Sequence, residues 1–389
     1  MHPTRFGADP RWGERAARPL RLVAGPGARP APAELAALRG ALMRRDEPAA
    51  ALVRAVSARD LRRLFDPGAP PPVRDFLAMA GKRPDWVDDR LLARGASACR
   101  AFGLDGFLVL AYGSLLGGYR TAAALEPLVR TGRLTGAGTL SRVRETSAWW
   151  RAVTAPGGLA ADGDGFQTTL RVRVMHALVN AKLEDDPAWD WAGRGVPINQ
   201  YDLGSTVGIF STSFLLHLRL LGVRVSREDG RAVMHLWAYV GWLMGVEDAW
   251  LPHTERQGRR LLYHFLAHDP PPDANTRALA KALIDMTDEV WPGRWRRRYE
   301  RERALSVSTW LLGRTAMRDL GLPARLPWYG LARVGTNLLA SQVMGRFPAG
   351  RRRLVARGDR EARTRLARWG AAAHATSAAD GARNDTGLA

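Results

Sequence analysis

The sequence predicts an all-α protein. Strand signals are almost absent, since we find neither a useful length of period-two alternation nor an Asn-Gly hairpin turn. Apolar residues recur at helical spacing instead, in segments that Gly- and Pro-rich stretches separate. The chain has 389 residues, of which 46% are hydrophobic, so it can build a core large enough to enclose a cofactor.

The expected elements follow in order along the chain. Residues 1–33 are rich in Pro, Gly and Arg and are expected to form an irregular arm. Residues 86–120 are expected to form a long apolar helix, although each of its glycines costs about 1 kcal/mol relative to Ala unless something packs closely against the backbone. Residues 371–389 are small and polar and are expected to be a disordered tail. Further helices are expected at 34–65, 72–80, 121–150 (two helices joined near 136–138), 166–183, 202–221, 229–246, 254–267, 273–290, 293–318 and 351–369.

The formal net charge is +20, and only three of the 58 basic residues are Lys. Such a charge attracts a protein to anionic surfaces, either lipid head groups or nucleic acid. The basic residues concentrate at 294–303 and 346–368, where a solvated helix face is the simplest interpretation. We find no zinc-finger spacing, helix-turn-helix signature or RNA-binding signature, so no nucleic-acid partner is expected.

Several features bear on the cellular compartment. Cys99 is the single cysteine, so no intrachain disulfide can form. The N-terminal segment lacks the apolar run of a signal peptide, and the apolar stretch at 207–218 is shorter than the roughly 20 residues of a membrane span. We therefore expect a cytoplasmic protein, with peripheral contact to an anionic membrane left open.

His176 lies in the middle of the helix predicted at 166–183. A neutral imidazole on a rigid helix is a common axial ligand of haem iron, and Arg is the side chain best suited to pair with haem carboxylates. Arg171 and Arg173 lie close by in the sequence. The alternatives are a core histidine with satisfied hydrogen bonds and two solvated arginines.

Arg142, Glu145, Thr146 and Trp149 fall at positions i, i+3, i+4 and i+7 of one predicted helix. This stripe combines polar residues with a large ring, as the wall of a binding pocket does. An ordinary amphipathic helix that exposes an ion pair between Arg142 and Glu145 is the alternative.

Other familiar motifs are missing from the sequence. We find no Gly-x-Gly-x-x-Gly after a strand, no Walker A motif, no Gly-x-Ser-x-Gly elbow and no His-Glu-x-x-His. His264 and His268 are four residues apart and could form a metal pair, but the sequence indicates no third ligand.

Three segments together resemble a known family. They are RVRET at 142–146, LRVRVMHALV at 170–179 and VPINQYDL at 196–203, and the apolar segment 220–246 fits the same pattern. Their order and spacing resemble the catalytic domain that MpaB-type oxygenases share with latex-clearing (rubber) oxygenases. The resemblance covers roughly residues 85–320. It divides the chain into an N-terminal arm with flanking helices (1–84), an oxygenase-like haem-binding domain (85–320), basic C-terminal helices (321–370) and a tail (371–389).

The resemblance implies a globin-like helical core with one haem b, flanked by extra helices. It makes His176 the axial iron ligand, with Arg171 and Arg173 on the haem-binding side. Arg142 and Thr146 match distal residues that donate hydrogen bonds, and Glu126 matches a proposed base by spacing only. The main departure is Glu145, which stands where rubber oxygenases have a lysine that can close the sixth iron position.

The function that the resemblance implies is a haem-dependent oxygenase that acts with dioxygen on a small apolar alkene, either isoprenoid or lipid-like. Glu145 and the missing export signal both argue against rubber as the substrate. Three other interpretations stay open: a haem protein without oxygenase activity, such as a sensor or a degenerate member, a membrane-surface protein, and a nucleic-acid-binding helical protein.

Overall fold

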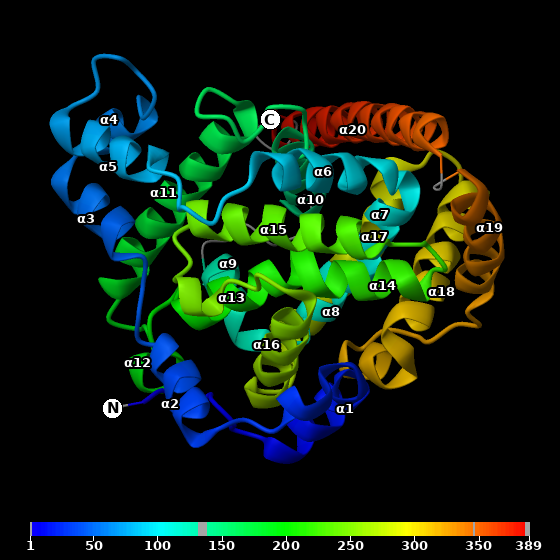
Figure 1. Cartoon of the computed structure of the whole chain (residues 1–389), viewed down its shortest axis with the longest axis horizontal. Coiled ribbons are helices and arrows are strands. Elements are labelled where there is room, and N and C mark those ends of the chain that lie inside the picture. The colour runs from blue at the N-terminus through cyan, green and yellow to red at the C-terminus, as the bar shows by residue number, and fades with distance from the viewer. Residues whose placement is uncertain (1, 131–137, 345–346, 386–389) are drawn as a thin grey trace.

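The computed structural model describes residues 2–130, 138–344 and 347–385. Within these ranges all regular structure is helical, which confirms the all-α prediction. Figure 1 shows a core of roughly horizontal helices, α13 (Gln200–Gly208), α14 (Phe214–Leu220) and α15 (Arg227–Leu243), with the remaining helices packed around them.

Helix α15 is the longest helix of this core, and most of its residues are buried. Ser226 caps its N-terminus, because the side chain of this residue accepts a hydrogen bond from the amide of Asp229. Helix α6 (Asp89–Ala101) runs alongside it, and Gly95 makes the close approach possible, because a Cβ atom there would clash with the carbonyl oxygen of Ala232. A side chain at this position would therefore separate the two helices that form the top of the core (Figure 1).

The prediction of one continuous helix at 86–120 is wrong, because the chain bends sharply within this range. The chain bends by 90° between α6 and the helices that follow it. Gly103 has φ +49°, a left-handed conformation that favours glycine, and the carboxylate of Glu361 accepts a hydrogen bond from the amide of Leu104 at 2.8 Å. Beyond the bend lie α7 (Gly103–Val109), the π-helical segment η2 (Leu110–Leu115) and α8 (Leu116–Gly118).

The N-terminal arm is more regular than expected. Residues 10–24 form helix α1 (Pro10–Ala24), which Asp9 caps by accepting a hydrogen bond from the amide of Trp12. Gly13 allows α1 to pack directly on α16 (Glu255–His268), because a Cβ atom there would clash with the carbonyl of Ala267. Tertiary packing thus stabilises a helix in a segment whose Pro, Gly and Arg content predicts none.

The single helix expected at 34–65 is divided into three. Asp46 and Ser57 each cap a new helix with a side-chain oxygen, which interrupts the pattern at these positions. The resulting elements are α2 (Pro32–Ala41), α3 (Glu47–Ala55) and α4 (Ala58–Arg62), followed by α5 (Pro71–Gly81).

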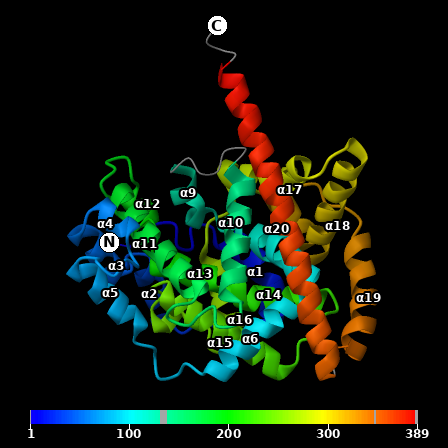
Figure 2. The same ribbon diagram turned by 90° about the horizontal axis from the view of Figure 1, so that it is seen from above.

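The C-terminal prediction also needs correction. Helix α20 runs from Pro348 to Asp385, so it continues through most of the segment expected to be disordered. Residues 371–382 are rich in Ala, the strongest helix former. Figure 2 shows α20 crossing the body of the molecule, where it contacts α6, α7, α10 and α17, before its last turns project beyond it.

The helices expected at 121–150, 166–183, 273–290 and 293–318 agree with the structure within a few residues, although the junction expected at 136–138 lies largely outside the described residues. They are α9 (Glu126–Arg130) with α10 (Gly138–Val153), α11 (Asp164–Glu184), α17 (Ala274–Val290) and α18 (Arg294–Asp319). The helix expected at 202–221 is interrupted by the π-helical segment η4 (Ile209–Ser213). Helix α19 (Trp328–Met344) lies within the region 321–370 that is expected to be helical, whereas α12 (Trp191–Arg194) and the short 3-10 helices η1 (Gly25–Ala28), η3 (Ala122–Leu125) and η5 (Asp248–Trp250) are not predicted from the sequence.

No single helix among the described residues has both the length and the apolar composition needed to cross a membrane. The bent pair Asp89–Ala101 and Gly103–Gly118 passes the same criterion by length and composition only.

The α6–α15 contact gives a stability prediction. Gly95→Ala should lower the free energy of unfolding by about 1–3 kcal/mol, because the added methyl group clashes with rigid backbone. Gly335→Ala in α19 is the matched control: a Cβ atom there meets nothing within 4 Å, so this variant should be neutral or slightly stabilising. Urea unfolding followed by circular dichroism measures both, and equal stability of the two variants would contradict the close packing.

Candidate active site

A cavity of about 650 Å³ lies inside the helical core. Its walls come from α6, α7, α10, α11, α13, α15 and α20, together with the π-helical segments η2 and η4. The volume is in the range of about 300–1,000 Å³ that small-molecule sites occupy. Most of the side chains that line it are apolar or aromatic, with a small number of polar and charged groups among them.

His176 lies on the wall of this cavity, near the middle of α11. Burial lowers the pKa of its imidazole to about 4, against a smaller opposing effect of Asp46, so the ring is neutral at physiological pH. Its Nδ1 atom is buried and has no hydrogen-bond partner among the described residues. A neutral imidazole on a cavity wall is suited to bind a metal centre through a ring nitrogen that is open to the cavity.

The segment VPINQYDL is fixed directly to the helix that carries His176. Asn180, one turn after His176, donates a hydrogen bond to the carbonyl of Ile198 at 2.9 Å and accepts one from its amide at 2.7 Å. Pro197 and Ile198 therefore line the cavity next to α11. The local sequence of each segment does not reveal this contact, which joins two of the segments that carry the family resemblance.

Helix α10 contributes the predicted polar stripe. Arg142, Glu145, Thr146 and Trp149 all line the cavity, as their shared helix face predicts. Ser141 donates a hydrogen bond to the carboxylate of Glu145 at 3.1 Å. The indole nitrogen of Trp149 donates to the hydroxyl of Thr169 at 2.9 Å, which fixes α10 against α11.

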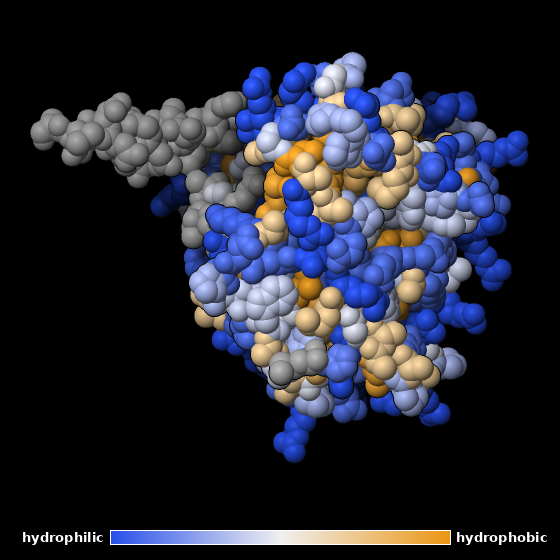
Figure 3. Space-filling model, turned by 90° about the vertical axis from the view of Figure 1, so that its left-hand side faces the viewer, coloured by the Kyte–Doolittle hydropathy of each residue, from blue (hydrophilic) through white to orange (hydrophobic). Residues whose placement is uncertain are grey.

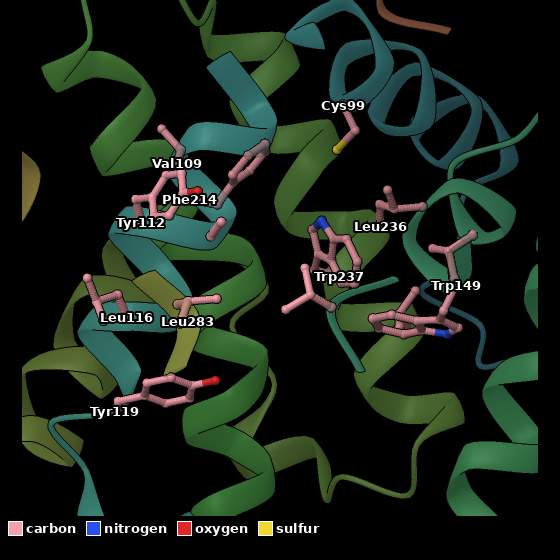
Figure 4. Packing of buried hydrophobic residues seen from close by; sticks show 14 of the residues in the cluster. Cys99, Val109, Tyr112, Leu116, Tyr119, Trp149, Phe214, Leu236, Trp237 and Leu283 are labelled. Atoms are coloured by element: carbon pink, nitrogen blue, oxygen red, sulfur yellow. The ribbon is translucent and has the colours of Figure 1, made fainter. Parts of the chain in front are cut away.

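Aromatic rings form the centre of the cavity wall. Trp237 of α15 stacks on Trp150 of α10 with ring centroids 4.5 Å apart, and on Phe210 of η4 at 5.1 Å. Figure 4 shows the indole of Trp237 between the rings of Trp149 and the thiol of Cys99. Burial raises the pKa of the Cys99 thiol to about 12, so this cysteine is a neutral wall group.

The two π-helical segments η2 and η4 pack against each other beside the cavity. The hydroxyls of Ser114 and Ser213 are 3.2 Å apart across this contact, and Ser213 is also 3.2 Å from Nδ1 of His217. Leu110 and Ile209, the first residues of the two segments, line the cavity. Such π-helical turns occur frequently at functional sites because they displace side chains from regular helical positions.

The structure does not bring Arg171 and Arg173 to the cavity, which corrects the expectation that they face a haem. Arg171 is exposed and lies over the ring of Phe65 at 4.8 Å, since five residues rotate it about 140° around the helix from His176. Arg173 is buried and pairs with Asp46 at 2.6 and 2.8 Å. Both arginines fix the N-terminal helices to α11.

Glu126 also does not line the cavity, whereas its two neighbours in the sequence, Leu125 and Pro127, do line it. Its carboxylate is buried between two guanidinium groups, Arg130 at 3.1 Å and Arg194 at 3.4 Å. The assignment of Glu126 as a base stays a prediction that this geometry does not favour.

Sequence reasoning missed other groups on the wall. Asp202 of the VPINQYDL segment lines the cavity, and its carboxylate is held by Arg5 of the N-terminal arm at 2.6 Å. Arg100, Arg151 and Arg365 also line it. No local signal could have identified them, because four different elements far apart in the chain supply these groups.

The histidine pair His264 and His268 has a structural role instead of a metal-binding one. Nε2 of His264 is 2.9 Å from the carbonyl of Gly27, and Nδ1 of His268 is 2.8 Å from the carbonyl of His264. The ring of His268 stacks on Phe6 at 4.7 Å. Among the residues that the structure describes, no group of three or more His, Cys, Asp or Glu side chains could hold a metal ion.

Comparisons with known proteins agree with this arrangement. Rubber oxygenase from Streptomyces sp. (strain K30) is 28% identical over 225 residues, which is 56% of this chain and about half (55%) of that protein's length. A solved structure of latex clearing protein in the closed state has a TM-score of 0.58 over 93% of this chain and 95% of that one. Its sequence identity is 22%, so this likeness shows the fold.

The model of one protein family matches residues 100–341, which include α10, α11 and the VPINQYDL segment. Its description is ER-bound oxygenase mpaB/B′/rubber oxygenase, catalytic domain. Because the match covers more than half of the chain, the chain belongs to this family of oxygenase catalytic domains.

Proposed function

We propose that the chain is a haem b-dependent oxygenase that acts with dioxygen on an apolar alkene, either isoprenoid or lipid-like. The observation that carries the proposal is His176, a neutral imidazole on the wall of a large apolar cavity. Membership of an oxygenase family supports the type of reaction.

The residues around the cavity fit a haem. Flat aromatic walls formed by Trp150, Phe210 and Trp237 suit an extended ring system. His176 would ligate the iron. Arg151 of α10, which lines the cavity, would pair with a haem carboxylate in place of Arg171 and Arg173.

When bound, the haem would supply the iron chemistry that activates dioxygen. The side chains of Arg142 and Thr146 would donate hydrogen bonds into the cavity and orient the reactants. The apolar wall would exclude water and hold the alkene. Glu145 would contribute a carboxylate where the family's rubber oxygenases have a lysine, which is why we propose a substrate other than rubber.

Glu145 also favours a second candidate function. Without the lysine, the chain could be a haem protein that does not oxygenate a substrate, such as a sensor. Oxygen consumption with isoprenoid alkenes separates the two candidates, because only the oxygenase consumes oxygen in proportion to product.

We further propose that the protein contacts an anionic membrane through α19 and the start of α18. Large apolar side chains are exposed there, including Leu326 at 82%, Trp295 at 68% and Leu331 at 52%. The rings of Tyr299 and Trp328 are 6.0 Å apart, which joins the ends of the two helices into one patch. Trp and Tyr are side chains that favour the interface between lipid and water.

Charge complementarity identifies the partner as an anionic lipid surface. Residues 320–358 contain seven arginines and no Asp or Glu. Arg352 and Arg353 at the start of α20 are exposed and have no ion-pair partner among the described residues. Such a surface attracts negatively charged head groups while its leucines enter the interface. By contrast, Figure 3 shows the opposite side of the molecule as largely hydrophilic, with an apolar strip exposed near the top of the view.

The iron ligand can be tested by removing it. His176→Ala should abolish retention of haem, measured as the Soret absorbance of protein purified from haem-supplied cells, before and after dithionite. His217→Ala is the matched control, because burial also lowers the pKa of His217 to about 4 although this residue does not line the cavity. A full Soret band in His176→Ala, or an equal loss in both variants, would refute the assignment.

The pH dependence of haem binding follows from the pKa of His176. Burial lowers this pKa from 6.5 to about 4, so the ring stays neutral and able to ligate down to about pH 5 and becomes protonated near pH 4. Haem retention should therefore be constant from pH 8 to about 5 and fall below that. Absorbance and far-UV circular dichroism recorded together separate release from unfolding, and loss centred near pH 6.5 would contradict the burial of the ligand.

Membrane contact can be tested by co-sedimentation with vesicles. The double variant Leu326→Glu/Leu331→Glu should bind vesicles that contain phosphatidylglycerol about tenfold more weakly, since two charges must be desolvated. Leu22→Glu is the control, because Leu22 is 88% exposed on α1, away from the patch. Equal binding by both variants, or a dimer that the double variant dissociates without lipid, would overturn the proposal.

A further inference from the structure

The cavity ends beneath α20 in a group of residues that the proposed haem site does not use. Arg365, Leu366 and Trp369 of α20 line this end, together with Phe107 of α7. The guanidinium group of Arg365 lies over the ring of Phe107, 4.0 Å from its centroid, and the rings of Phe107 and Trp369 are 5.4 Å apart. A cation therefore occupies an aromatic pocket at one end of an apolar cavity.

Arg365 has no carboxylate or carbonyl partner among the described residues. Glu361, one turn earlier on α20, is the nearest acid, but its carboxylate accepts hydrogen bonds from the amide of Leu104 and from Nε of Arg357, each at 2.8 Å. Burial lowers the pKa of Arg365 to about 10, with Glu361 opposing this shift. The group still carries a positive charge at neutral pH.

Two other partly buried arginines nearby are paired. Arg100, also on the cavity wall, contacts Asp359 at 3.3 Å, and Arg303, beneath α20, pairs with Glu300 at 2.7 Å. Arg365 is also partly buried, and a charge that is partly removed from water is stabilised when an anion pairs with it. The unpaired guanidinium is accounted for if a ligand provides the anion.

We propose that Arg365 binds the carboxylate head group of an amphiphilic substrate whose apolar chain fills the cavity towards His176. The inference rests on the proposed function, because it takes the substrate to react near His176. A monoanion fits better than a phosphate monoester, since one unpaired cation is present at this end. The planar guanidinium can hold both oxygens of a carboxylate along its edge while Phe107 covers one of its faces. The substrate class is thus an unsaturated long-chain carboxylic acid.

Two probes with the same chain and different head groups test this inference. Oleate and oleyl alcohol carry the same 18-carbon monounsaturated chain, and quenching of Trp fluorescence reports their binding below the concentration at which they form micelles. The wild-type protein should bind oleate about tenfold or more tightly than the alcohol, as expected for a desolvated ion pair. Arg365→Met should remove this preference and leave the affinity for oleyl alcohol within about twofold.

Arg363→Met is the matched control, because Arg363 is exposed on the same helix and does not line the cavity. It should retain the wild-type preference for oleate. Equal binding of both probes by the wild type, or a preference that survives in Arg365→Met, would overturn the inference. Loss of the Soret band in Arg365→Met would also overturn it, since Arg365 would then hold a haem carboxylate. The preference for oleate is measured separately from the Soret band of His176→Ala. Failure of the haem assignment and failure of this inference are therefore distinguishable.

Discussion

The centre of the molecule is built around the imidazole of His176, which is partly buried and whose buried Nδ1 atom has no hydrogen-bond partner among the described residues. An unsatisfied buried nitrogen is destabilising, so the helix that carries His176 must be held in place by other contacts. Three contacts do so: Arg173 pairs with Asp46, Asn180 binds both backbone groups of Ile198, and Thr169 accepts a hydrogen bond from Trp149. They join α11 to the N-terminal helices, to the VPINQYDL segment and to α10. The scaffold is rigid around a group that is left free to bind a ligand.

The large positive charge has more than one use in this structure. Several arginines act inside the protein as braces between distant segments, such as Arg120 with Asp319, Arg333 with Asp105 and Arg5 with Asp202. Arginines of this kind offer no charge to a nucleic acid. Arg365 differs from them because it lies on the cavity wall and its nearest carboxylate is bound elsewhere. Arginines therefore have three roles in this structure. Some join distant segments through ion pairs, some face solvent near the apolar patch, and Arg365 places a cation on the cavity wall.

Close backbone contacts at a few positions set the spacing of the helices that surround the cavity. Gly95 brings α6 against α15, and the left-handed Gly103 turns the chain by 90°. The π-helical segments η2 and η4 meet beside the cavity. A longer side chain at either glycine would force apart elements whose separation defines the cavity wall. Function and packing are thus coupled through a small number of backbone positions.

The sequence by itself determined the properties that depend on local spacing. Helical periodicity was sufficient to predict the all-α class, to put His176 near the middle of a helix and to place Arg142, Glu145, Thr146 and Trp149 on one face, because 3.6 residues per turn fix which side chains share a face. Only the tertiary structure decided which partner each side chain meets. It directed Arg173 to Asp46, held Glu126 between two arginines and brought Arg365 to the cavity. The first of these contacts joins residues 127 positions apart, and all of them depend on how helices pack, which no local pattern encodes.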